Sequence, residues 1–198
     1  MTRTFDLLAA ILGLLVLLPF LLLIALVIKL EGRGPVFFRQ VRVGKAGQLF
    51  RIWKFRTMVV DAESMGHQIT VGADRRITRT GAWLRSWKLD ELPQLINVLV
   101  GEMGFVGPRP EVPRYVALYT EAQRQVLDLR PGITDLASIT YRNESELLKT
   151  SADPEAFYIQ HVLPDKIRIN LDYAARATIS RNLKVILATL GLLSPRKV

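Results

Sequence analysis

Asp90 and Glu91 are the residues whose types and spacing point most directly to chemistry in this sequence. They stand side by side at the expected start of a helix, and the cations Arg85 and Lys88 precede them. A carboxylate can attack phosphorus and form an aspartyl phosphate when a divalent metal or nearby arginines neutralise the phosphate oxygens. Helix capping is the competing structural explanation, because negative charge is stabilised at a helix N-terminus.

Two further segments carry cations that suit a phosphate site. Arg109 stands between Pro108 and Pro110, and the restricted backbone of such a segment would present the guanidinium rigidly. Lys54 and Arg56 are interleaved with apolar residues after an expected β-hairpin. This pattern fits a phosphate site, and it also fits side chains that extend along a membrane surface towards water.

The N-terminal segment is expected to lie in a membrane. Residues 7–28 are 22 consecutive uncharged and mostly aliphatic residues, and roughly 20 are enough to cross a bilayer as a helix. The segment is longer than the apolar part of a secretory signal, so we expect it to be retained. On hydropathy alone, a spanning helix with a kink at Pro19 is favoured over a re-entrant helix that enters and leaves on one side.

The net charge of +9 is unevenly distributed. Residues 29–56 hold eight Lys and Arg but one acid, Glu31, which suits anionic lipid on the cytoplasmic side or a phosphorylated substrate. Nucleic acid is disfavoured as a partner for a domain held at a membrane. With no cysteine, disulfides and thiolate metal sites are excluded, and two distant histidines disfavour a histidine metal site.

Periodicity predicts an α+β, mostly helical fold. A β-hairpin is expected over residues 36–55, with its turn at 44–47. Trp83 and Trp87 are four residues apart in an expected helix, where they could either face a membrane interface or fill a core. Helices are expected over residues 76–89, 91–100, 114–129, 154–177 and 183–193.

Five stretches together resemble the bacterial sugar transferase family, the monotopic polyprenyl-phosphate phosphoglycosyl transferases. They lie in the family's order and cover most of residues 30–135, and their combination is specific although each is short. The total length resembles the family's minimal catalytic form without appended domains. The stretches are 34–40 (GPVFFRQ), 54–58 (KFRTM), 77–81 (ITRTG), 89–98 (LDELPQLINV) and 106–111 (VGPRPE).

The resemblance implies a two-step transfer. Asp90 would attack the β-phosphate of a UDP-sugar and release UMP, and polyprenyl phosphate, in bacteria usually undecaprenyl phosphate, would then take up the phosphosugar. The product would be the first lipid-linked intermediate of a surface glycan. Mg²⁺ is implied at Asp90 and Glu91, with Glu91 positioning metal or substrate. The implied substrate-binding residues are Arg85, Arg109, Lys54, Arg56, Pro108 and Pro110.

The resemblance also implies an arrangement at the membrane. Residues 1–30 would form a re-entrant membrane helix with its break at Pro19, which reverses the preference drawn from hydropathy. Residues 31–198 would form a compact catalytic domain with a small β-hairpin and interfacial amphipathic helices. The expected location is the cytoplasmic face of the bacterial inner (plasma) membrane. The expected partners are UDP-sugar, polyprenyl phosphate and the phospholipid membrane, with homodimerisation left open.

Departures from the family pattern leave the sugar open. Asp135 and Ser138 stand where the family usually has glycine and glutamine, and Leu18 replaces a serine that often precedes the proline. Two other functions remain as alternatives: a non-catalytic scaffold that binds anionic lipids, and a transferase without a covalent intermediate. A scaffold would have no need of Asp90 and Glu91.

Overall fold

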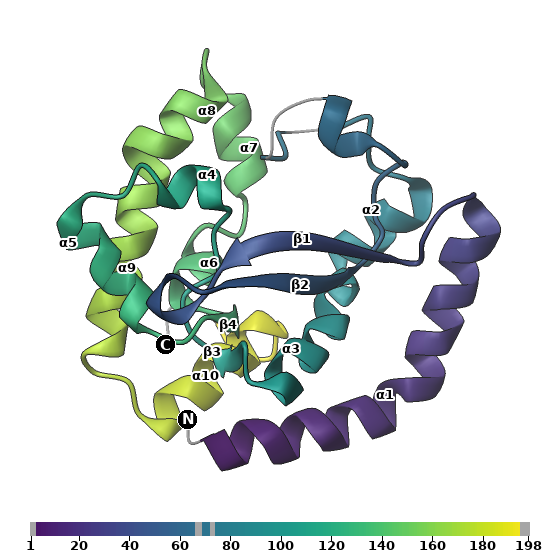
Figure 1. The fold of residues 1–198 in the computed structure, drawn as a ribbon, viewed down its shortest axis with the longest axis horizontal. Coiled ribbons are helices and arrows are strands. Elements are labelled where there is room, and N and C mark those ends of the chain that lie inside the picture. The colour runs from purple at the N-terminus through teal and green to yellow at the C-terminus, as the bar shows by residue number, and fades with distance from the viewer. Residues whose placement is uncertain (1–2, 66–68, 72–73, 195–198) are drawn as a thin grey trace.

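The computed structural model describes residues 3–65, 69–71 and 74–194, and helices predominate in its α+β fold (Figure 1). The long helix α1 (Arg3–Glu31) leads into the antiparallel hairpin of β1 (Phe37–Val43) and β2 (Leu49–Phe55), which confirms the predicted hairpin. A 3₁₀ turn, η1 (Lys45–Gly47), closes the hairpin. In Figure 1 the hairpin crosses the middle of the molecule, between the C-terminal helices and α2.

The segment after the hairpin holds the acid pair. It contains a 3₁₀ turn, η2 (Ala62–Met65), then α2 (Arg79–Ser86), the 3₁₀ helix η3 (Leu89–Gln94) and α3 (Leu95–Val100). The helix predicted over 91–100 is therefore two elements, and the acid pair lies in a 3₁₀ turn instead of an α-helical one.

The second half differs from prediction in two places. The expected helix over 114–129 is broken into short pieces, because Thr120 caps a new helix with its side chain. A parallel pair of three-residue strands was not predicted. The elements are β3 (Gly104–Val106) beside β4 (Gly132–Thr134), α4 (Pro113–Val116), α5 (Glu121–Arg124), η4 (Gln125–Asp128), α6 (Leu136–Thr140) and α7 (Glu144–Lys149).

The predicted C-terminal helices are present. α8 (Pro154–Phe157) continues through a π-helical turn, η5 (Tyr158–Val162), into α9 (Leu163–Ala174), and α10 (Ile179–Thr189) follows. Pro164 lies just after the π-helical turn, so this continuous helix accommodates a residue that has no amide N–H to donate where its hydrogen-bond pattern changes.

Helix α1 changes direction along its length and wraps two sides of the domain (Figure 1). Pro19 lies inside it, and sharp bends in helices are usually found at proline. Before Pro19, Ala10 packs in a core cluster with Met103; after it, Ile24 and Ile28 pack in a second cluster that includes Leu84. By length and composition alone, α1 could cross a bilayer.

Both ends of α1 are tied to the rest of the chain. At the start, the Arg3 guanidinium donates hydrogen bonds to the carbonyl oxygens of Val98 and Leu99. At the end, the Glu31 carboxylate accepts from the Thr78 hydroxyl and the Thr80 amide, each at 2.9 Å. The two ends of the helix are therefore held by one folded unit.

Trp83 and Trp87 are exposed at 50% and 69% of their surfaces, so the interpretation that they fill a core was wrong. On α10, Leu183 and Leu187 are exposed while Val185 is buried. These side chains leave apolar surface on the outside of the domain.

Gly81 allows α2 to pack directly on the backbone of Thr57. A Cβ at Gly81 would overlap the Thr57 carbonyl group, so we expect Gly81→Ala to lower the free energy of unfolding by about 3 kcal/mol. Gly32→Ala is the matched control, because a Cβ there meets no atom within 4 Å, and its effect should stay within about 0.5 kcal/mol. Thermal unfolding of the two purified variants measures the difference; equal melting temperatures would contradict this packing.

Candidate active site

The acid pair is positioned by a reversal of the chain between two helices. α2 ends at Ser86, and Lys88 adopts a left-handed conformation with φ of 58° before η3 begins. A non-glycine residue in this conformation costs about 1 kcal/mol, which the surrounding structure must offset. The reversal places Asp90 and Glu91 in the first turn of η3, facing the body of the domain.

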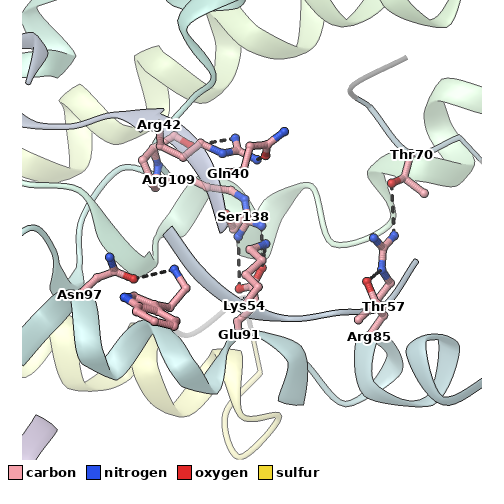
Figure 2. Close-up of polar contacts among 12 residues, drawn as sticks. Gln40, Arg42, Lys54, Thr57, Thr70, Arg85, Glu91, Asn97, Arg109 and Ser138 are labelled. Carbon is pink, nitrogen blue, oxygen red and sulfur yellow. Dashed lines mark hydrogen bonds and ion pairs between the residues drawn. The ribbon is translucent and has the colours of Figure 1, made fainter. Parts of the chain in front are cut away.

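Glu91 is held between two cations from distant parts of the sequence (Figure 2). Its Oε1 accepts from Lys54 Nζ at 2.8 Å and from Arg109 Nη2 at 2.6 Å. Burial by itself would raise the pKa of Glu91, but Arg109 and Lys54 lower that pKa well below its usual value. Glu91 is therefore a fixed negative charge that joins β2, η3 and the loop after β3.

Asp90 has the opposite environment. Its surface is 7% exposed, and its carboxylate forms no hydrogen bond within the described part of the chain. Burial raises the pKa of Asp90 and the Glu91 charge adds to that rise, while Lys54, Arg85 and Arg109 oppose it. Asp90 is thus the more basic of the two carboxylates and has oxygens free to react or to bind a cation.

Both acids lie on a cavity of about 740 Å³. Among the described residues, its wall carries nine Lys and Arg side chains and five Asp and Glu side chains, an excess of four positive charges. Such an excess suits a polyanionic ligand such as a nucleoside diphosphate. The structure brings six of the predicted site residues to this cavity: Asp90, Glu91, Lys54, Arg56, Arg85 and Arg109.

Arg85 and Arg56 differ in how they are held. Arg85 Nε donates to the Thr57 hydroxyl at 2.9 Å and Nη1 to the Thr70 hydroxyl at 3.2 Å, both neutral partners (Figure 2). Arg56 donates to the carbonyl oxygens of Ile28 and Gly32 at 3.0 and 3.1 Å, so it caps the end of α1. Arg85 therefore keeps its charge available to a ligand, whereas Arg56 is largely occupied by the fold.

Pro108 and Pro110 act on the site through the loop that holds Arg109. The Pro108 carbonyl accepts from the Gly132 amide at 3.1 Å, and the Pro110 carbonyl accepts from Arg42 Nη1 at 3.0 Å. Both prolines line a separate, small cavity of about 40 Å³. Their place in the structure is that of residues that position Arg109.

The prediction from sequence missed Arg42, a buried arginine on the cavity wall. Its Nη2 donates to Gln40 at 2.6 Å, and its Nε is buried without a hydrogen-bond partner among the described residues. Burial lowers the pKa of Arg42, and Glu111 opposes that change. Strand alternation was a usable signal, because Phe38, Gln40 and Arg42 share one face of β1.

The far wall of the cavity is formed by residues from the C-terminal half, which lie outside the sequence motifs that predicted the site. Tyr158 donates its hydroxyl to Glu111 at 2.6 Å, and Lys166 forms an ion pair with Glu144. Tyr141 also lines this wall. Only the tertiary packing of α6 against α9 brings these residues to the site.

A magnesium site must be judged from the donors that the chain offers. The described residues contain no group of three or more His, Cys, Asp or Glu side chains placed to hold a metal. Glu91 is engaged by two cations, whereas the Asp90 oxygens are available. Mg²⁺ is often bound by one or two carboxylates together with substrate phosphates, and Asp90 fits that mode.

The pattern of the family described as "Bacterial sugar transferase" matches residues 1–194. The chain belongs to the bacterial sugar transferase family.

Individual relatives cover different shares of the chain. It is 40% identical over 195 residues to the undecaprenyl-phosphate glucose phosphotransferase of Komagataeibacter xylinus, covering 95% of this chain and 35% of the relative. It is 44% identical over 141 residues to the uncharacterized sugar transferase EpsL of Bacillus subtilis, and these residues cover 71% of this chain and 69% of the relative. The UDP-N-acetylgalactosamine-undecaprenyl-phosphate N-acetylgalactosaminephosphotransferase of Aeromonas hydrophila is 37% identical over 166 residues, which cover 80% of this chain and 39% of the relative. The chain thus spans little more than a third of two of these relatives.

The opposite environments of the two acids predict opposite effects on stability. Glu91→Gln leaves Lys54 and Arg109 without their counter-charge and should lower the free energy of unfolding by about 3 kcal/mol. This value is at the low end of the range for breaking a buried ion pair, because the Arg109 side chain is 34% exposed. Asp90→Asn removes a buried charge that has no hydrogen-bonded partner in the described part of the chain, so it should raise the melting temperature at pH 7.

The pH dependence of the melting temperature tests whether the ionised carboxylate of Asp90 is the cause of the gain in Asp90→Asn. A folded-state pKa above the unfolded value means that ionised Asp90 destabilises the fold at neutral pH. The gain in Asp90→Asn should therefore disappear as the pH falls below the usual carboxyl pKa, where Asp90 is protonated in both states. A melting temperature that falls in both variants at pH 7 would contradict the assignment.

Proposed function

We propose that this protein transfers a sugar phosphate from a UDP-sugar to polyprenyl phosphate through a covalent aspartyl intermediate on Asp90. The observation that carries the proposal is the carboxylate of Asp90, which has a raised pKa and no hydrogen-bond partner among the described residues, in a cation-rich cavity beside a Glu91 already neutralised by Lys54 and Arg109. The names of the relatives from Komagataeibacter and Aeromonas support the overall transfer, since both are sugar phosphotransferases named with undecaprenyl phosphate.

In the first step, an Asp90 carboxylate oxygen attacks the β-phosphorus of the UDP-sugar. The bond between this phosphorus and the oxygen bridging to UMP breaks, and UMP leaves with that oxygen. Arg85 and Arg109 lie on the same cavity and offset the charge that develops on the phosphate oxygens. Glu91 acts as a positioning residue here, because it holds Lys54 and Arg109 beside the reacting group.

In the second step, a phosphate oxygen of polyprenyl phosphate attacks the same phosphorus, and the Asp90 carboxylate leaves. The products of the whole cycle are polyprenyl-diphospho-sugar and UMP, and Asp90 is regenerated. Lys54 lies close enough to lower the pKa of Asp90, so it also stabilises the departing carboxylate. Mg²⁺, when bound by Asp90 and substrate phosphate, would supply further charge neutralisation.

The contacts of α1 support a re-entrant arrangement at the membrane. A straight helix of 29 residues would be about 43 Å long and would carry its two ends to opposite sides of a hydrocarbon core about 30 Å thick. Arg3 and Glu31 instead contact the same domain, and Pro19 lies between them. Both ends would then face the cytoplasm, with exposed Trp83, Trp87 and Leu183 at the membrane surface.

The covalent step is tested by Asp90→Asn. Wild-type protein incubated with UDP-glucose or UDP-N-acetylgalactosamine and Mg²⁺ should release UMP and retain the sugar phosphate, seen as an added mass on the peptide that contains residue 90. Asp90→Asn lacks the nucleophile and should lower turnover with polyprenyl phosphate by about 10³-fold or more.

Asp172→Asn is the control, because Asp172 is an exposed acid on α9 that pairs with Arg168 and should leave activity unchanged. Normal turnover in Asp90→Asn would show that Asp90 is not the nucleophile. Turnover that requires both substrates before any UMP appears would favour transfer without a covalent intermediate.

The topology is tested with cysteines, since the chain has none of its own. Thr4→Cys and Gly32→Cys place one thiol near each end of α1. In intact cells, neither should react with a membrane-impermeant maleimide, and both should react after permeabilisation. Labelling of residue 4 from outside, with residue 32 protected, would restore a spanning helix.

A further inference from the structure

The cavity beside Asp90 is bordered by an apolar rim, which consists of Pro35, Phe37, Met58, Val59 and Val60. Phe37, Val59 and Val60 are exposed at 37%, 42% and 50% of their surfaces although they line a charged cavity. Exposed apolar side chains around a cation-rich site are costly in water unless something covers them.

The two segments of the rim lie side by side. The Arg56 amide donates to the Val36 carbonyl at 2.9 Å, which joins the start of β1 to the end of β2. A Cβ built on Gly34 would lie 2.8 Å from Val60 Cγ2, so the chain before Pro35 contacts the chain after Met58. The rim is therefore one continuous surface.

The rim adjoins the end of α1. Arg56 follows β2 and caps α1 through the carbonyls of Ile28 and Gly32, so the rim begins where α1 ends. On this part of α1, Leu26 and Leu30 are exposed at 55% and 77%. Apolar surface thus runs from α1 to the rim, and cationic surface lies inside the cavity.

We propose that the rim receives the first isoprene units of the polyprenyl phosphate acceptor, while its phosphate enters the cavity towards Asp90. A ligand that matches both surfaces has one anionic head and a long apolar tail, and the acceptor has this chemistry. A nucleotide sugar offers no tail to cover the rim. The inference rests on the proposed function and assigns to the acceptor a part of the cavity that the phosphate-binding residues do not account for.

The two half-reactions separate the acceptor from the donor. In detergent micelles of fixed composition, Val59→Asn and Val60→Asn should each raise the KM for polyprenyl phosphate roughly tenfold, with kcat nearly unchanged. UMP release before the acceptor is added should match wild type. The variants should also lose the preference of wild type for a long-chain over a short-chain polyprenyl phosphate.

Two matched controls replace leucines outside the cavity. Leu49→Asn lies at the other end of β2 and is 65% exposed in wild type, and Leu12→Asn lies on α1 before Pro19 and is 64% exposed. Neither should change the KM for the acceptor. If Leu12→Asn raised it as much as the rim variants do, the rim would be only a bilayer contact. An unchanged KM in the rim variants, or slower UMP release, would also overturn the proposal.

Photocrosslinking tests the rim without turnover. A polyprenyl phosphate with a photoreactive group in its first isoprene unit should label residues 35–37 or 58–60, and excess polyprenyl phosphate should compete while phosphatidylglycerol should not. Equal competition by phosphatidylglycerol would overturn the inference. If wild type releases no UMP yet labels in this way, the proposed reaction fails and the lipid site stands.

Discussion

The burial of one carboxylate between two cations is the interaction on which this site depends. Glu91 meets Lys54 and Arg109, which lie 37 residues before it and 18 residues after it. Removing one partner of a buried ion pair leaves an uncompensated charge, so each of the three side chains depends on the others. The hairpin, the 3₁₀ turn and the loop after β3 are consequently fixed relative to one another, and Asp90 takes its position from them.

The two adjacent carboxylates lie in opposite environments. Glu91 has a lowered pKa, and its carboxylate accepts hydrogen bonds from two cations. Asp90 has a raised pKa, and its carboxylate accepts no hydrogen bond from the described residues. Paired acids whose environments separate their pKa values commonly take different roles in catalysis. The sequence predicted the pair and the nearby cations, but only the tertiary contacts separate the two roles.

Local patterns predicted the parts of the fold that local forces determine. Alternation identified the hairpin, and periodicity identified α2 and α10, because these segments are long enough to show a period. The strands β3 and β4 have three residues each, too few for any pattern, and Lys166 reaches the cavity only through packing. Asp135 and Ser138, which depart from the family pattern, are joined to each other: the Asp135 carboxylate accepts from the Ser138 amide at 2.8 Å and caps α6.

The inward face of α1 has a consequence for how the protein is made. Ala10, Ile24 and Ile28 are almost fully buried, and they complete cores formed by residues as distant as Met103. Without α1, the surfaces around Phe50 and Leu84 would be open to water. Folding of the later segments is therefore coupled to the docking of the first segment, because neither core is closed until α1 lies in place.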